Sequence, residues 1–298
     1  MKERRWEPGG PLDVGLALQP HRRGGGDPTW RTGGDGAVWR TSRTPDGPCT
    51  LRVSVEGGRV HGRAWGPGAD WALETLPALL GGHDDLAGFS VRHEVLAEAV
   101  RRHPGLRIGR TGRVMEALVP AVLEQKVVGR EAWRAWRWLL TRYGEPAPGP
   151  APDGMRVVPE AAVWRQIPSW HWHRAGAEAV RARTVATAAW HAAKLEAAAT
   201  TEELDRLLRA LPGVGVWTSA EVRQRVFGDP DAVSVGDFHL AKLVGYALTG
   251  EKTDDQGMLR LLEPYEGHRH RATVLVWLSG LRPPARGPRM PVRDYRAF

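Results

Sequence analysis

The chain has 298 residues, enough for one large domain or two smaller ones, with a formal net charge of +8 and a pI near 10.2. This basic excess favours a polyanionic partner such as nucleic acid, although a general preference for arginine produces the same charge. Cys49 is the only cysteine, which excludes an intrachain disulfide and a cysteine-ligated iron–sulfur cluster. Residues 1–7 lack an apolar signal core and no run approaches eighteen apolar residues, so we expect a soluble cytoplasmic protein with no membrane partner.

Residues 12–88 are predicted to form a small mixed α/β domain, after a flexible N-terminus over residues 1–11. Apolar and polar residues alternate on both sides of Gly57-Gly58, which supplies a two-residue hairpin turn. The apolar face consists of Leu51, Val53, Val55, Val60, Gly62 and Ala64. The opposite face carries Arg52, Arg59, His61 and Arg63. These basic side chains either touch phosphates or, more simply, form a solvated surface. A preceding strand over residues 37–39 and a short helix over residues 71–80 complete the domain.

The hydrophobic period changes to that of helices near residue 89, and residues 89–282 are predicted to form an all-helical domain. Helices are expected over residues 91–102, 114–128, 130–143, 160–166, 175–198, 201–210, 217–227, 238–249, 255–263 and 267–281. Arg130, Arg134 and Arg137 share one side of their helix and are interpreted as a solvated face. The proline-rich residues 144–152 are predicted to be a loop, and residues 283–298 a flexible basic tail. The predicted fold class is α+β, mostly α.

The segment Leu211-Pro212-Gly213-Val214-Gly215-Val216-Trp217-Thr218 is predicted to form a tight hairpin that opens a helix. Gly213 and Gly215 permit positive φ, and their missing side chains let a ligand approach the backbone closely. The first N–H groups of the helix near Thr218 have no partner within the helix, so they form an anion site that fits a DNA phosphate. Such a hairpin occurs in many DNA-binding proteins and by itself indicates backbone binding without chemistry.

One carboxylate follows the hairpin at a defined distance. Asp237 lies twenty residues after Trp217, within Ser234-Val235-Gly236-Asp237-Phe238-His239. Aspartate is a good N-cap for the helix expected from Phe238, and the same side chain is a candidate catalytic group. The two roles are compatible, and the hairpin beside the carboxylate favours catalysis on DNA.

The hairpin and Asp237 together resemble the helix-hairpin-helix DNA glycosylases. Within that superfamily the chain is similar to the 3-methyladenine DNA glycosylase II branch over residues 12–282, with further matches at residues 22–29 and 117–127. The resemblance implies an N-terminal mixed sheet followed by two helical subdomains. It also implies a monomeric base-excision repair enzyme of the bacterial cytoplasm, associated with the nucleoid. Such an enzyme binds damaged double-stranded DNA, flips out an alkylated purine and hydrolyses its N-glycosidic bond.

The resemblance assigns chemical roles to individual residues. Asp237 is expected to stabilise the oxocarbenium-like sugar that forms as the base leaves, and to orient the attacking water. Trp217 occupies the position where lyases of the superfamily have a Schiff-base lysine, so no lyase activity is expected. The backbone carbonyls of Arg209, Leu211 and Val214 are expected to bind a structural Na⁺ or K⁺ ion, and no other cofactor is expected.

The same resemblance predicts which residues contact DNA. The expected contacts are Gly213, Val214, Gly215 and Thr218 in the hairpin, His239 after the catalytic aspartate, and Gln125 and Lys126. The last two lie in the segment that should fill the space left by the flipped base. Related enzymes place an apolar residue at the position of Lys126, and a core helix is the alternative interpretation of this segment.

Trp217 and Trp277 are predicted to form an electron-rich pocket for a cationic methylated purine. Glu221, one helical turn after Trp217, either faces this pocket and favours cationic bases or points to solvent. Two other functions are compatible with the sequence: a glycosylase for oxidised or deaminated bases, and a non-catalytic damaged-DNA-binding protein. The missing lysine argues against an oxidised-base lyase, and Asp237 argues against a silent binding protein.

Overall fold

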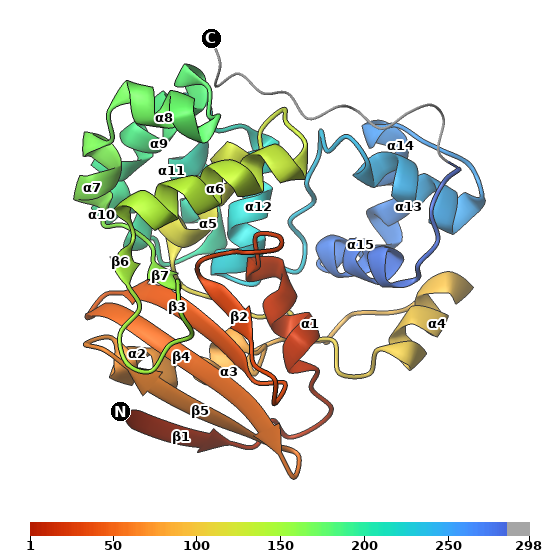
Figure 1. Cartoon of the computed structure of the whole chain (residues 1–298). Coiled ribbons are helices and arrows are strands. Elements are labelled where there is room, and N and C mark those ends of the chain that lie inside the picture. Colours follow the sequence, from red (N-terminus) through yellow and green to blue (C-terminus); the bar gives the residue numbers. More distant parts are fainter. Residues whose placement is uncertain (285–298) are drawn as a thin grey trace.

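The computed structural model describes residues 1–284 and consists of a five-stranded sheet below two groups of helices (Figure 1). The sheet is antiparallel, with strand order β1-β5-β4-β3-β2. Its strands are β1 (Lys2–Trp6), β2 (Trp30–Thr32), β3 (Val38–Thr44), β4 (Gly47–Glu56) and β5 (Arg59–Trp65). Part of the predicted flexible tail, residues 285–298, lies outside the described residues.

The strands follow the predicted alternation. Leu51 and Val53 are buried, whereas Val55 near the end of β4 is exposed. Gly57 and Gly58 both have positive φ, as a two-residue turn between twisted strands requires. The prediction of a flexible N-terminus over residues 1–11 is wrong for residues 2–6, because their backbone pairs with β5.

Short helices cover the apolar face of the sheet and build the first core. They are α1 (Val14–Leu18), η1 (Gln19–His21), α2 (Ala69–Glu74) and α3 (Leu76–Leu79). The region predicted as one helix over residues 71–80 is divided between α2 and α3. Gly62 of β5 lets Leu76 pack closely, since a Cβ at Gly62 would lie 2.6 Å from Leu76 Cδ2.

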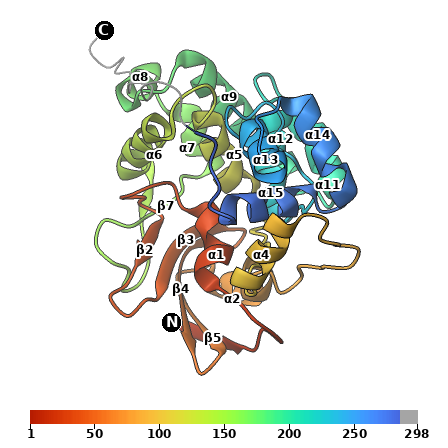
Figure 2. The same ribbon diagram turned by 90° about the vertical axis from the view of Figure 1, so that its right-hand side faces the viewer.

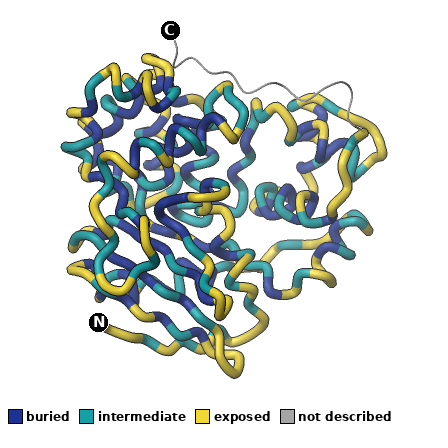
Figure 3. The backbone as a smooth tube through the Cα atoms, in the orientation of Figure 1, coloured by how far each residue is buried: buried dark blue, intermediate teal, exposed yellow. Residues whose placement is uncertain are grey.

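The helical part contains two further cores, and the buried stretches of backbone in Figure 3 follow them. The larger core lies among α5 (Val114–Leu123), α6 (Gly129–Tyr143), α7 (Ala161–Gln166), α8 (Ser169–Ala175), α9 (Ala179–Trp190), α10 (Ala192–Glu196), α11 (Thr201–Arg209) and α12 (Val216–Val226). The smaller joins α4 (Glu94–Arg102) to α13 (Leu240–Thr249), α14 (Asp255–Leu262), η2 (Glu263–Tyr265) and α15 (Arg269–Leu278). Figure 2 shows α4 below α15. The predicted fold class is confirmed.

Two predicted helices are too long. The helix from residue 114 ends at Leu123, and Lys126 beyond it has the left-handed φ of 56°. The helix predicted over residues 175–198 is two helices, because α8 ends at Ala175 before Gly176, which has φ 85°, and a break at His191 separates α9 from α10. The predicted loop over residues 144–152 contains β6 (Glu145–Pro146), which pairs with β7 (Arg156–Val157) just after the loop.

The sheet and the helices are joined by buried polar contacts. Glu116 of α5 accepts hydrogen bonds from Arg40, from the Ser42 hydroxyl and from the Arg43 N–H. Arg113 donates to the Arg43 carbonyl and pairs with Glu196 at 3.1 Å. These contacts fix the sheet domain against the larger helical core. Through residue 284, none of the helices combines the length and the apolarity that a membrane span needs.

Candidate active site

The predicted hairpin is present and connects α11 to α12. Gly213 has φ 85°, and a Cβ there would collide with the Thr184 hydroxyl, so this position requires glycine. Gly215, for which the sequence permits a positive φ, has an extended backbone with φ −102°. A Cβ built at Gly215 meets nothing within 4 Å, so its backbone is open to a ligand. The buried side chain of Val214, between the two glycines, anchors the turn.

The N-terminus of α12 presents unpaired donors beside this turn. The Ser219 N–H donates to the Gly215 carbonyl at 3.0 Å as the first helical bond, so the N–H groups of Val216, Trp217 and Thr218 precede the ladder. Thr218 as a whole residue is only 2% exposed, whereas Val216 is 48% exposed, so the N–H groups before Thr218 are the ones that a phosphate can reach.

Gln125 braces the hairpin through its side chain. Its Nε2 donates to the Gly213 carbonyl at 2.9 Å and to the Thr218 hydroxyl at 2.8 Å. The neighbouring Lys126 is exposed and has a strained left-handed backbone. The structure therefore brings both residues of this predicted DNA-contact segment next to the hairpin.

The carboxylate of Asp237 is held from two sides. Its Oδ1 accepts hydrogen bonds from the N–H groups of His239 and Leu240, both at 2.8 Å, at the start of α13. Its Oδ2 accepts a hydrogen bond from Trp217 Nε1 at 3.3 Å. The side chain thus bonds the N–H groups at the start of α13, and the carboxyl group lies at the positive end of the helix dipole. Asp237 is half-buried, so the oxygen facing Trp217 stands at the edge of the helical core.

Comparisons with known proteins fit this geometry. No protein-family model matches the chain. Over 149 residues the chain is 32% identical to the probable bifunctional transcriptional activator/DNA repair enzyme AlkA of Mycobacterium tuberculosis. That match spans 49% of this chain and 29% of the relative, so less than a third of the relative is represented.

Two solved structures match over nearly the whole chain. The 3-methyladenine DNA glycosylase of Archaeoglobus fulgidus has a TM-score of 0.73 at 16% identity and covers 93% of this chain and 97% of its own. The apo form of the 8-oxoguanine glycosylase/lyase of Clostridium acetobutylicum has a TM-score of 0.70 at 12% identity, covering 94% of this chain and 97% of its own. The chain has the fold of the helix-hairpin-helix DNA glycosylases.

In this glycosylase fold, Glu221 lies one turn along α12 from Trp217 and does not point to solvent. Its carboxylate accepts a hydrogen bond from the Ser234 hydroxyl at 2.5 Å and pairs with Arg225 at 2.9 Å. Burial alone raises the pKa of Glu221, but Arg225, Ser234 and the more distant Arg23 bring it below its ordinary value. The charge of Glu221 is therefore compensated inside the protein.

Two histidines that sequence reasoning did not place in the site lie near this ion pair, His270 near Glu221 and His21 near Arg225. Burial, partly offset by Glu221, lowers the pKa of His270 to about 4. Burial and the guanidinium groups of Arg40, Arg225 and Arg23 hold the pKa of His21 well below its usual range. Both rings are neutral near pH 7. The sequence gives no signal for this cluster because its members come from η1, α12 and α15.

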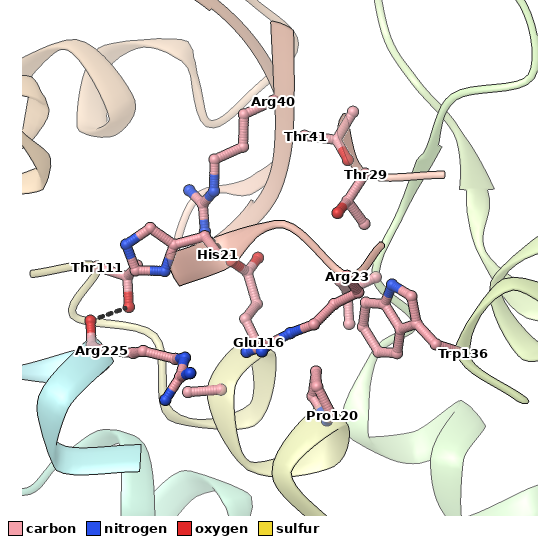
Figure 4. A pocket seen from close by; sticks show the side chains of 12 residues that line it. His21, Arg23, Thr29, Arg40, Thr41, Thr111, Glu116, Pro120, Trp136 and Arg225 are labelled. Carbon is pink, nitrogen blue, oxygen red and sulfur yellow. Dashed lines mark hydrogen bonds and ion pairs between the residues drawn. The ribbon is translucent and has the colours of Figure 1, made fainter. Parts of the chain in front are cut away.

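A cavity of about 20 Å³ lies against the same cluster and has room for about one water molecule (Figure 4). His21, Arg40, Thr111 and Arg225 are among its lining residues, and Thr111 Oγ1 donates to the Arg225 carbonyl at 3.1 Å. None of the predicted site residues lines this cavity, so it belongs to the junction between sheet and helices.

The other predicted aromatic pocket residue lies on α15. Trp277 is 60% exposed, and the guanidinium of Arg282 stands over its ring at 4.1 Å. Trp217 contacts Asp237, as described, so a shared box of the two tryptophans stays a prediction. Sequence reasoning missed Phe238, which is 68% exposed beside Asp237 and carries the Lys242 ammonium over its ring at 4.1 Å. His239 is also exposed and stands edge-on to Phe238.

The carbonyls predicted to hold a monovalent cation lie in the hairpin. The Leu211 carbonyl accepts one hydrogen bond, from the Val214 N–H at 3.1 Å. Among the described residues, the carbonyls of Arg209 and Val214 accept no backbone hydrogen bond. The Na⁺ or K⁺ ion expected on these three carbonyls stays a prediction.

Proposed function

We propose that this protein is a monofunctional DNA glycosylase of base-excision repair. The observation that carries the proposal is the position of Asp237: one carboxylate oxygen caps α13, and the other faces Trp217 beside the hairpin. A carboxylate fixed in this way can stabilise the positive charge that develops on the sugar as the base leaves. The same oxygen can orient the water that attacks the sugar.

The DNA backbone would bind at the hairpin. The N–H groups at the start of α12 and the open backbone of Gly215 supply donors for a phosphate. A monovalent cation on the carbonyls of Arg209, Leu211 and Val214 would add positive charge to the same turn. The partner of this surface is damaged double-stranded DNA, with His239 and Lys126 exposed beside the hairpin.

Hydrolysis without strand cleavage follows from the residue at position 217. A lyase needs an amine that attacks the sugar, and the indole of Trp217 has none. The nearest lysine in sequence to Asp237 is Lys242, whose ammonium donates to the Phe238 carbonyl at 3.2 Å and covers the Phe238 ring. Because these contacts occupy the Lys242 ammonium, they support water as the nucleophile that attacks the sugar.

Alkylated purines of the 3-methyladenine and 7-methylguanine type are the substrates that we favour. Alkylation at N3 or N7 makes the base cationic and weakens the glycosidic bond, so a π surface such as Trp217 is sufficient for recognition. The names of the Mycobacterium tuberculosis and Archaeoglobus fulgidus proteins support this class. The Ser234 hydroxyl donates to Glu221 and accepts from Gln224, and Glu221 pairs with Arg225, so this buried group supplies no free charge that would select a cationic base. Oxidised or deaminated bases are therefore the second candidate.

The test is base release from damaged DNA. Duplexes treated with a methylating agent, and separate duplexes that contain 8-oxoguanine or hypoxanthine, are incubated with the protein, and released bases are identified by mass spectrometry. We expect 3-methyladenine and 7-methylguanine from the wild type and neither from Asp237→Asn. Binding to every duplex without release of any base would leave the protein as a damage-binding factor and refute the proposal.

A further inference from the structure

A wide basic groove runs along α6, away from Asp237. It encloses about 1180 Å³ and lies between α6, α8 and the loop before β2, elements that are neighbours in Figure 1. Of its ten lining residues five are arginines and none is acidic. The arginines are Arg130, Arg134, Arg137 and Arg142 of α6 and Arg174 of α8. The sequence interpreted three of them as a solvated face.

Most of these arginines differ from several other exposed arginines of the protein, which form ion pairs. On the sheet, Arg59 and Arg63 pair with Glu7 and Glu3, and on α4 Arg101 pairs with two glutamates. Within residues 1–284, no ion pair holds Arg130, Arg137, Arg142 or Arg174. Several like charges in one groove repel each other, and a bound polyanion removes that repulsion.

The wall of the groove contains aromatic rings. Trp133 and Trp138 line it, and both are half-buried. The ring of Trp133 lies against Gly24 so closely that a Cβ there would collide with it, which fixes the indole in place. Trp138 meets the ring of His171 at 5.4 Å in an edge-on contact. Rigid rings between cations offer surfaces on which unpaired bases can stack, whereas a duplex keeps its bases inside.

The length and position of the groove suit a nucleic-acid strand. Arg130 and Arg142 are twelve residues apart on one helix, or about 18 Å along its axis, which matches several phosphates of one strand. One end of the groove is close to a hairpin-contacting residue along the chain. Arg130 is five residues after Gln125, whose side chain contacts Gly213. A strand that leaves the hairpin can therefore continue along α6.

We propose that the groove along α6 is a binding site for single-stranded DNA. The arginines would neutralise successive phosphates, while Trp133 and Trp138 would stack with unpaired bases. The site is separate from Asp237 and does not depend on the activity proposed there.

The test compares two double variants of equal charge change. Arg137→Glu/Arg142→Glu alters the groove, and Arg59→Glu/Arg63→Glu alters paired, exposed arginines on the sheet as the matched control. Fluorescence anisotropy measures binding of a labelled ten-nucleotide oligothymidylate and of an undamaged duplex over a range of salt concentrations. Circular dichroism checks that each variant folds.

We expect the groove variant to lose on the order of tenfold in affinity for oligothymidylate. The slope of log affinity against log salt should become shallower by about 1.4, since each lost phosphate contact removes roughly 0.7 on a single strand. The control variant should bind oligothymidylate within about twofold of the wild type, and duplex affinity should be the same for the groove variant and the control. An equal loss for oligothymidylate and duplex, or no loss beyond the control, would overturn the assignment.

A second measurement isolates the contribution of aromatic stacking to DNA binding. Trp138→Leu keeps every charge, and its affinity for oligothymidylate should fall while its affinity for inorganic polyphosphate, which has no bases, stays unchanged. Equal effects on the two ligands would show that charge alone explains binding and would refute base stacking. Asp237→Asn should bind oligothymidylate like the wild type, which distinguishes this site from the proposed active site.

Discussion

The two oxygens of Asp237 have separate tasks. Oδ1 accepts two N–H groups of the α13 N-terminus, whereas Oδ2 has only the long bond from Trp217. Asp237→Asn keeps a capping oxygen but removes the negative charge. We expect base release in single-turnover assays to fall by at least about two orders of magnitude, with DNA affinity and melting temperature nearly unchanged. Near-normal turnover would reduce Asp237 to a helix cap.

The side chain at position 217 determines what happens after the base has left. With Trp217 beside the carboxylate, the protein should leave intact abasic sites in DNA, with strand breaks only after alkali. The check is borohydride trapping, which captures a Schiff base between protein and sugar. A trapped adduct at the wild-type rate of base release would contradict the prediction, and repeating it with Lys126→Ala and Lys242→Ala would identify the amine.

At the scale of single residues, the sequence predicted the role of a side chain where that role depends on contacts with its neighbours in the chain. Asp237 was predicted to cap a helix from Phe238. Its side chain does bond the N–H groups of His239 and Leu240, although α13 begins two residues later, at Leu240, with His239 as its N-cap residue. For Glu221 the sequence left two orientations, toward a pocket or toward solvent. The partners that decide the matter, Arg225 and Ser234, are visible only after α12 and the following loop pack together.

Two glycines of the hairpin, Gly213 and Gly215, allow a matched test of how the turn contributes to stability. Gly213→Ala forces a Cβ into Thr184 at a left-handed φ, and we expect a loss of roughly 1–3 kcal/mol in the free energy of unfolding. Gly215→Ala has an ordinary φ and open space, so its stability should stay within about 0.5 kcal/mol of the wild type. Urea unfolding measures both values.

The same pair separates folding from binding. The methyl group of Gly215→Ala would stand where a DNA backbone approaches, so its duplex affinity should fall although its stability does not. If Gly215→Ala bound duplex DNA as tightly as the wild type, the hairpin would not be the phosphate site. Anisotropy with a duplex containing a stable abasic-site analogue provides the measurement.

At the scale of elements, periodicity located nearly every helix but misjudged where some of them end. The helix predicted to reach residue 128 ends at Leu123 because the chain turns at Lys126 to bring Gln125 to the hairpin. A helical pattern continued through residues 175–198, yet Gly176 adopts a left-handed conformation and the chain bends again at His191. These breaks are set by packing against other helices, which a local pattern does not record.

At the scale of the whole molecule, neutral histidines lie where the three cores meet. His270 of α15 and His21 of η1 flank the Glu221–Arg225 pair of α12. Because the folded pKa of His270 is about 4 against an ordinary 6.5, the unfolded chain takes up its proton first as the pH falls. Stability should therefore decline from about pH 6.5 to about pH 4, and stay full above that window.

The measurement is the melting temperature as a function of pH for the wild type and His270→Gln. Glutamine cannot take up a proton, so the variant should lose less stability between pH 6.5 and pH 4. Parallel curves for the two proteins would show that another group controls the decline. The depressed pKa of Asp231, for which burial is outweighed by Arg269, affects stability only at lower pH, because its ordinary value is 3.8.

Only part of this assembly could be read from the sequence. The sheet, the helical part and their order follow from the change of period near residue 89, and the fold class was correct. The interface between the sheet and the helices depends on ion pairs such as Arg40–Glu116. The two residues of such a pair are far apart in the chain, so no local sequence pattern predicts their contact. The groove along α6 was hidden for the same reason, since its opposite wall comes from α8 and the loop near Gly25.

The N-terminal strand has a consequence for how the protein behaves in concentrated solution. β1 covers the outer side of β5, and its Lys2, Glu3, Arg4 and Arg5 give the sheet a charged border. Charged borders discourage sheets of different molecules from joining edge to edge. Removing residues 1–7 would uncover β5, and we expect the shortened protein to self-associate in light-scattering measurements under conditions where the full chain does not.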